Sequence, residues 1–285
     1  MSTSLTTIDG VAGKLALREL AGDQTSPHTL LIAHANGFHG QMYRAFAQAL
    51  GDDVRVFALD FRGHGDSDAP ADLDGFEWSG MTDDAGAVVE HLNALGMDRL
   101  HAFGHSLGGA ALIDLERQRP GTFASLFAFE PVMAPREAFN PDSPLTRSAK
   151  ARFRTFPSKA AALMRYSARP PLGLFRADVL FDYVEHGFTE LPDGSATLKC
   201  LPEHEAEVFR RGAKAIHLDQ AAEVASEVVI GRSGDGGLPA QLAQPIVDKL
   251  LQGRLLDFPD ISHFGPLQDP VGVAKAMREL IEETT

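Results

Sequence analysis

The chain has 285 residues, of which 44% are hydrophobic and 23% are charged, a composition that excludes a disordered or fibrous protein. Its net charge is −13, from 26 basic and 39 acidic residues. Such a surface repels phosphate backbones and anionic lipid, so nucleic acid and membranes are not expected as partners. Cys200 is the only cysteine, which leaves no intramolecular disulfide and suits a reducing compartment.

The amino terminus lacks the features of a signal peptide. Residues 1–10 (MSTSLTTIDG) contain neither a basic start nor an apolar run. No apolar stretch in the chain approaches the roughly 20 residues that a membrane-spanning helix needs. The expected location is the cytoplasm, and the expected partner is a small-molecule substrate.

Short apolar runs alternate with helical patterns in the first half of the chain. The helix predicted over 82–95 is the clearest, because its apolar residues recur at helical spacing and Gly96 follows as a stop. Strand–helix–strand alternation predicts a parallel sheet with helices on both faces. The predicted strands are 14–20, 29–35, 54–60, 99–105 and 125–129, and the predicted helices are 41–50, 82–95 and 107–119.

The pattern changes after residue 132. Amphipathic stretches separated by proline and charge replace the buried strands, at 148–156, 158–167, 178–188 and 202–211. An insertion of this length is too long for a plain loop and predicts a helical cap over 133–216. The strand–helix alternation then resumes, with predicted strands at 227–231 and 254–258 and a predicted helix that begins at Asp269-Pro270. The core domain is therefore predicted to comprise 1–132 and 217–285.

Ser106 is the candidate nucleophile. It lies in Gly104-His105-Ser106-Leu107-Gly108, which fits G-x-S-x-G at the junction of a predicted strand and a predicted helix. A tight turn there needs small flanking residues and lifts the hydroxyl out of the sheet. The alternative is an ordinary strand–helix turn that happens to hold a serine.

A serine nucleophile needs a base, and His263 is the candidate. It follows the strand at 254–258 and precedes the last helix, in a loop at the edge where open α/β sheets place their sites. The alternative is a histidine of a surface loop. His39, His64 and His105 are competitors, of which His39 is the strongest.

Four segments together resemble the α/β-hydrolase fold family, in the same chain order. They are residues 34–37 (HANG), 60–67 (DFRGHGDS), 104–108 (GHSLG) and 262–264 (SHF). The resemblance implies a mostly parallel sheet flanked by helices, with a helical cap inserted after the sixth strand. It also implies a Ser–acid–His triad in that order.

Two carboxylates compete for the acid of that triad. Asp235 follows the strand at 227–231, which is the family's usual place for the acid, and it is preferred on chain position alone. Glu130 is the alternative, because Phe129-Glu130-Pro131 resembles the pattern of haloalkane dehalogenases. The carboxylate that is not the acid would be structural, as Asp60 is expected to be.

The resemblance places the oxyanion hole at the backbone N–H groups of Asn36 and Leu107. The side chain of Asn36 could add a donor or could only shape the loop, and both interpretations stay open. No metal-ligand pattern or phosphate-binding loop occurs, so neither a metal nor another cofactor is expected.

These patterns predict a serine hydrolase that cleaves small to medium carboxylic esters through an acyl-enzyme. Alternatives with the same triad are a C–C bond hydrolase of aromatic ring-cleavage products and a cofactor-free perhydrolase or haloperoxidase. An alternative of another class is a non-catalytic ligand-binding protein on a hydrolase scaffold. Candidates for an apolar pocket wall in the cap are Met133, Phe153, Met164, Phe175, Phe181, Tyr183 and Phe188.

Overall fold

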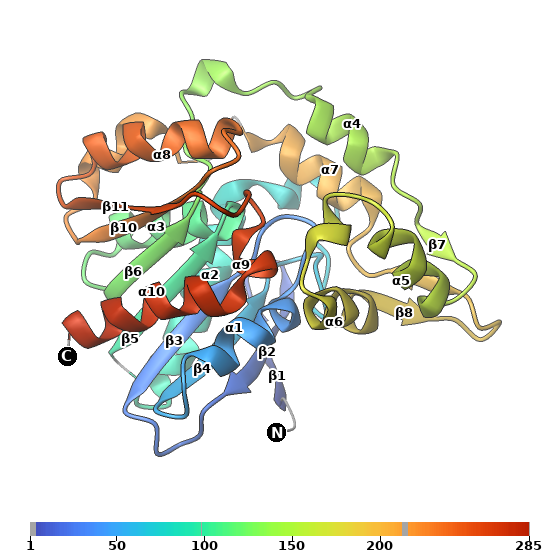
Figure 1. The fold of residues 1–285 in the computed structure, drawn as a ribbon, viewed down its shortest axis with the longest axis horizontal. Coiled ribbons are helices and arrows are strands. Elements are labelled where there is room, and N and C mark those ends of the chain that lie inside the picture. The colour runs from blue at the N-terminus through green and yellow to red at the C-terminus, as the bar shows by residue number, and fades with distance from the viewer. Residues whose placement is uncertain (1–3, 98, 213–215, 285) are drawn as a thin grey trace.

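An eight-stranded sheet forms the centre of the computed structural model, which describes residues 4–97, 99–212 and 216–284 (Figure 1). The strand order is β1-β2-β4-β3-β5-β6-β10-β11. The pairs β1–β2 and β2–β4 are antiparallel and the others are parallel, which confirms the predicted mostly parallel sheet. The strands are β1 Ser4–Gly10, β2 Gly13–Ala21, β3 His28–Ala33, β4 Val54–Asp60, β5 Leu100–His105, β6 Phe123–Phe129, β10 Val228–Ser233 and β11 Gly253–Phe258.

Helices cover both faces of this sheet. Alternate residues of β3 enter opposite cores: Leu30 packs with the helices α1 and α10, and Leu31 packs with α2, α3 and α8. In Figure 1, α1 and α10 lie in front of the sheet. The core helices are α1 Arg44–Ala49, α2 Trp78–Ala94, α3 Leu107–Gln118, α8 Leu238–Lys249, α9 Gly265–Gln268 and α10 Pro270–Glu283. Short 3₁₀ turns are η1 Gly40–Tyr43, η2 Leu73–Phe76, η3 Arg136–Ala138, η4 Leu172–Leu174 and η6 Leu218–Glu223.

The segment between β6 and β10 forms a cap beside the sheet, at the right of Figure 1. Its helices are α4 Pro144–Lys150, α5 Lys159–Ser167, α6 Ala177–Gly187 and α7 Pro202–Arg210. The cap also holds a three-stranded antiparallel sheet of β7 Thr155–Phe156, β9 Ala196–Leu198 and β8 Phe188–Glu190. The domain division at 132/133 and 216/217 stays a prediction, and residues 213–215 lie outside the described residues.

Two expectations for the cap are corrected. The cap is not purely helical, because β8 and β9 form a hairpin across the turn at Pro192-Asp193-Gly194, and strands of three residues are too short to show an alternating pattern. The amphipathic stretch at 148–156 is helical only up to Lys150, at the end of a helix that begins at Pro144. Ser143 caps it by accepting the N–H of Thr146.

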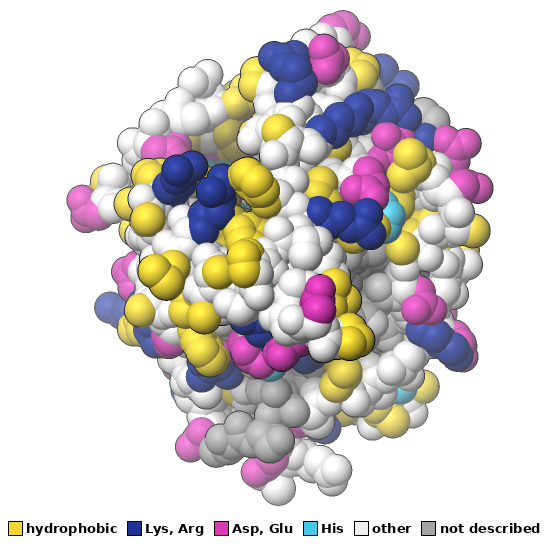
Figure 2. All heavy atoms as spheres, turned by 90° about the vertical axis from the view of Figure 1, so that its right-hand side faces the viewer, with side chains coloured by type: hydrophobic (Ala, Val, Ile, Leu, Met, Phe, Trp, Pro, Cys, Tyr) yellow, Lys and Arg dark blue, Asp and Glu magenta, His cyan; other side chains and the backbone are white. Residues whose placement is uncertain are grey.

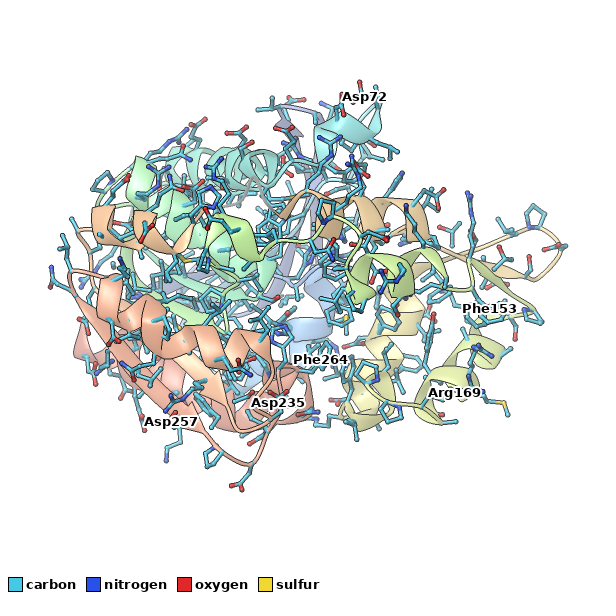
Figure 3. All side chains as sticks on the ribbon, turned by 90° about the horizontal axis from the view of Figure 1, so that it is seen from above. Asp72, Phe153, Arg169, Asp235, Asp257 and Phe264 are labelled. Carbon is cyan, nitrogen blue, oxygen red and sulfur yellow. The ribbon has the colours of Figure 1, made fainter. Side chains whose placement is uncertain are left out.

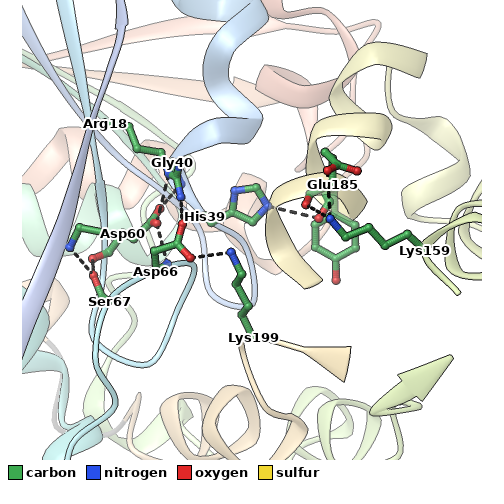
Figure 4. A network of polar contacts seen from close by, with 11 residues as sticks. Arg18, His39, Gly40, Asp60, Asp66, Ser67, Lys159, Glu185 and Lys199 are labelled. Carbon is green, nitrogen blue, oxygen red and sulfur yellow. Dashed lines mark hydrogen bonds and ion pairs between the residues drawn. The ribbon is translucent and has the colours of Figure 1, made fainter. Parts of the chain in front are cut away.

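Polar contacts connect the cap to the core. The Arg44 guanidinium binds Asp182 of α6 at 2.8 Å. The Lys199 ammonium lies 2.5 Å from Asp66, whose backbone N–H binds the buried carboxylate of Asp60 (Figure 4). Asp60 also accepts the N–H of Gly40 at 2.7 Å and therefore shapes the loops around the site. No helix within the described ranges is long and apolar enough to cross a membrane.

Candidate active site

Ser106 occupies a strained turn between the last residue of β5 and the first residue of α3. Its φ is 55° and its ψ is −113°, a conformation that residues other than glycine rarely adopt. Neighbouring glycines allow the turn to close: a Cβ on Gly108 would collide with the Ala33 carbonyl oxygen. The Ser106 N–H donates to the Phe129 carbonyl oxygen at 3.0 Å, which anchors the turn to β6.

Glu130 and His263 form a close pair beside this turn. The Nδ1 atom of His263 lies 2.6 Å from Oε2 of Glu130, and the carboxylate is fully buried while 19% of the histidine side chain is exposed. The other carboxylate oxygen accepts the N–H of Ser233 at 2.7 Å. Glu130 thereby fixes the ring and leaves Nε2 as the nitrogen that can take a proton.

Asp235 contacts the same histidine through the backbone. Its carboxylate accepts the N–H of His263 and the N–H of Gly237, both at 2.8 Å, and the Ser233 hydroxyl at 3.1 Å. Burial raises the pKa of Asp235, but the hydrogen bonds from Gly237 and His263 outweigh it and hold the pKa below its usual value.

These contacts favour Glu130 as the partner of the His263 ring, whereas chain position alone favours Asp235. Strand β6 lies between β5 and β10 in the sheet, so Glu130 at the end of β6 is one strand nearer to Ser106. Asp235 lies two residues beyond the end of β10 and turns back onto its own loop. Which carboxylate supports catalysis stays a prediction.

His105 joins the nucleophile turn to the histidine loop. Its Nε2–H donates to the carbonyl oxygen of His263 at 2.8 Å, and Nδ1 accepts the Tyr43 hydroxyl at 2.8 Å. Burial, followed by the neighbouring charge of His263, lowers the pKa of His105 well below its usual value. Among the described residues, no hydrogen bond joins the Ser106 hydroxyl to the His263 ring, so proton transfer requires the two groups to approach each other.

The remaining competitor histidines are held inside the protein. The His39 ring stacks on Tyr183, and burial lowers its pKa to about 4. His64 lies against Asn36 and Gly37, and burial lowers its pKa to about 3. Both rings are neutral at pH 7 and position loops.

The expected oxyanion donors lie on two adjoining segments. Leu107 is the first residue of α3, whose N-terminus packs through Gly108 against the carbonyl groups of Ala33 and His34. The Asn36 amide donates to the Glu205 carbonyl oxygen at 3.0 Å, and its oxygen lies 3.1 Å from His64 Nε2. These contacts favour loop shaping as the role of the Asn36 side chain. Use of the two backbone N–H groups stays a prediction.

A cavity of about 590 Å³ lies between the core and the cap. Asn36, Phe38 and Phe264 line it from the core, and Figure 3 shows Phe264 and Asp235 on the core side, with Phe153 and Arg169 on the cap. Of the expected wall residues, Phe153 and Tyr183 line the cavity. Met133, Phe175 and Phe188 are buried in the packed interior, and Met164 and Phe181 are exposed.

Sequence reasoning did not identify the arginines at this cavity, Arg152, Arg165 and Arg169. The positive charge of the amphipathic stretches at 148–156 and 158–167 was the available signal for Arg152 and Arg165, and Arg169 lies just beyond the second stretch. Cys200 is buried, which raises the pKa of its thiol and fits a structural role. Within the described part of the chain, no group of three or more His, Cys, Asp or Glu residues is arranged to hold a metal ion.

Comparison with known proteins identifies the family. A sequence model described as "Alpha/beta hydrolase family" matches residues 30–276. The chain belongs to the alpha/beta hydrolase family. This confirms the resemblance inferred from residues 34–37, 60–67, 104–108 and 262–264.

Two curated hydrolases resemble parts of this alpha/beta hydrolase. A monoglyceride lipase of Homo sapiens is 30% identical over 122 residues, which are 41% of this chain and 38% of that protein. A pimeloyl-[acyl-carrier protein] methyl ester esterase of Methylococcus capsulatus is 37% identical over 100 residues, 35% of each protein. The chain thus spans little more than a third of the curated relatives it matches.

A solved structure extends the likeness to the whole fold. The crystal structure of an E-2-(acetamidomethylene)succinate hydrolase superposes with a TM-score of 0.79 over 99% of this chain and 100% of that chain, at 20% identity. At this identity the superposition shows the fold alone and does not identify the substrate.

Proposed function

We propose that this protein is a serine hydrolase that cleaves carboxylic esters, with Ser106 as nucleophile, His263 as general base and Glu130 as the acid. The observation that carries the proposal is the 2.6 Å contact between Glu130 and His263 Nδ1, beside a serine held at φ 55°. A buried carboxylate that fixes one nitrogen of an imidazole prepares the other nitrogen to accept a proton.

The reaction has two stages. In the first, Ser106 Oγ attacks the ester carbonyl carbon and its proton passes to His263 Nε2. The oxyanion forms near the N–H groups of Leu107 and Asn36, and the C–O bond to the alcohol breaks as His263 returns the proton to the leaving oxygen. In the second, His263 takes a proton from water, the hydroxide attacks the acyl-enzyme, and Ser106 leaves with the proton.

Glu130 contributes by its charge and its position. It is fully buried, so its attraction to the imidazolium that forms in each stage is little screened by water. It accepts from Ser233 on its other oxygen, which holds the carboxylate in one orientation.

The names of the curated relatives support ester cleavage. One is a monoglyceride lipase and the other a methyl ester esterase, and both act on carboxylic esters by name. The cavity beside Asn36 and Phe264 offers room for an acyl group of small to medium size.

The test is hydrolysis of p-nitrophenyl esters from acetate to decanoate. We expect the parent protein to be active and Ser106→Ala to lose at least about 10³-fold in kcat/KM, because the nucleophile is removed. Ser195→Ala, in the exposed turn of the cap hairpin, is the matched control and should keep full activity.

Two results would count against the ester proposal. Activity that persists in Ser106→Ala would show that another group is the nucleophile. If the parent protein cleaves none of the esters, the ester proposal is wrong. The remaining candidates are then a C–C bond hydrolase with the same triad and a ligand-binding protein.

A further inference from the structure

The cavity between the core and the cap is rich in arginine. Arg152, Arg165 and Arg169 line it from the cap. Among the described residues that line it, Glu205 is the only acidic one, and it already pairs with Arg152. Arg152 also donates to the hydroxyl of Tyr183, so its donors are largely occupied within the protein.

Arg165 and Arg169 are different. Neither has a carboxylate within ion-pair distance among the described residues, whereas most other arginines do, such as Arg44 with Asp182. The Arg165 guanidinium lies over the Phe153 ring, 4.2 Å from its centre. The net charge of the chain is −13, so two arginines without a carboxylate partner at one cavity make that cavity locally positive. A locally positive cavity favours an anionic ligand.

Both arginines belong to the cap, whereas the proposed reacting residues belong to the core. Arg165 lies in the last turn of α5, and Arg169 follows that helix. The core side of the cavity holds Asn36 and Phe264, which belong to the proposed oxyanion loop and to the histidine loop. A series of aromatic rings joins the two sides, from Phe153 beside Arg165 to Phe264 beside His263. In order, the rings between them are Phe156, Tyr166, Tyr183 and Phe38. Figure 2 shows this side of the molecule, where basic and hydrophobic side chains are intermixed.

We propose that the substrate is an ester whose acyl chain ends in a carboxylate, and that Arg165 and Arg169 bind this carboxylate. The proposal deepens the function above and rests on it for the identity of the scissile bond. A guanidinium presents parallel N–H donors that match the two oxygens of a carboxylate, and the ion pair is stronger in a partly enclosed cavity. The apolar middle of the cavity suits a hydrocarbon spacer between the carboxylate and the ester carbonyl.

A pair of matched esters tests this specificity. Monomethyl adipate carries a free carboxylate, and methyl hexanoate has the same chain length without it. We expect the parent protein to prefer monomethyl adipate by at least about tenfold in kcat/KM, the effect of one or two charge-assisted hydrogen bonds. Added NaCl should raise KM for monomethyl adipate alone.

The variants Arg165→Gln and Arg169→Gln should each reduce the ratio of the two kcat/KM values, and the double variant should bring the ratio near one. Arg165→Lys should restore part of it. Arg147→Gln is the control, because Arg147 is an exposed arginine of α4 that pairs with Asp142 and does not line the cavity. An unchanged ratio in the double variant, or a parent preference for methyl hexanoate, would overturn the proposal.

A binding experiment separates this inference from the proposed function. Ser106→Ala is titrated calorimetrically with adipate and with the uncharged hexanamide. If neither ester is cleaved but adipate binds at least tenfold more tightly, and the double arginine variant abolishes the difference, the ester proposal fails and carboxylate recognition holds. Equal binding of the two compounds, or no binding of adipate, would refute carboxylate recognition even in an active esterase.

Discussion

At the scale of the residue, two carboxylates contact different parts of His263. Glu130 binds the imidazole ring, and Asp235 binds the backbone N–H of the same residue. Strands β6 and β10 are neighbours and end at the same edge of the sheet, so both carboxylates reach the histidine loop. Chain position alone could not separate them, because the choice depends on which group each side chain meets.

The two carboxylates predict different consequences of amide substitution. Glu130→Gln should reduce kcat by about 10³- to 10⁴-fold, because an amide neither fixes the correct tautomer nor stabilises the imidazolium. Asp235→Asn should reduce kcat by less than about tenfold and lower the free energy of unfolding by about 1–2 kcal/mol, because it weakens backbone contacts of the loop. Steady-state kinetics and urea unfolding of both variants check this, and a larger kcat loss in Asp235→Asn would reverse the assignment.

The backbone of Ser106 predicts a gain in stability. At φ 55° any residue with a side chain is disfavoured. The free energy of unfolding of Ser106→Gly should therefore be about 1 kcal/mol higher than that of Ser106→Ala, although both variants lose activity. Thermal and urea unfolding measure the difference. A glycine variant less stable than the alanine variant would show that the turn is not strained.

At the scale of the element, the junction of β5 and α3 depends on close backbone packing. Gly108→Ala should lower the free energy of unfolding by about 3 kcal/mol or more, because its Cβ would meet the Ala33 carbonyl oxygen, which belongs to the rigid sheet. Gly86→Ala, within α2, is the matched control, because its Cβ would make only ordinary contacts with Arg119 and Leu115. This control should stabilise the protein by up to about 1 kcal/mol. Equal unfolding midpoints for the two variants would contradict the packing argument.

Elements with a strong pattern were predictable and short ones were not. The buried strand at Val54–Asp60 and the helix after Ser106 follow directly from a continuous apolar run and from a glycine-flanked turn. The cap sheet was missed because β8 and β9 have three residues each, and only tertiary contacts define them. The cavity arginines were missed for a similar reason, because the sequence does not show which arginines have a carboxylate nearby in the folded protein.

At the scale of the whole molecule, buried histidines predict how stability depends on pH. Burial lowers the pKa of His34 and His39 to about 4 and that of His64 to about 3, against about 6.5 in an unfolded chain. Between pH 6.5 and pH 4 the unfolded chain therefore binds more protons than the folded protein. The free energy of unfolding should fall as the pH falls through this window, by at most about 3 kcal/mol for each histidine.

Urea unfolding at pH 7.5, 6.5, 5.5 and 4.5 measures this dependence. An unfolding midpoint that stays constant from pH 7.5 to 4.5 would show that the three rings are not kept neutral by the fold.

We propose above that Ser106 is a nucleophile activated by His263 and Glu130. The most direct measurement is reaction with a fluorophosphonate, followed by peptide mass spectrometry, because this reagent forms a covalent bond with an activated serine. We expect a single adduct on Ser106, whose rate of formation falls at least about 10²-fold in His263→Gln and in Glu130→Gln. An unlabelled Ser106, or labelling at an unchanged rate in both variants, would contradict it.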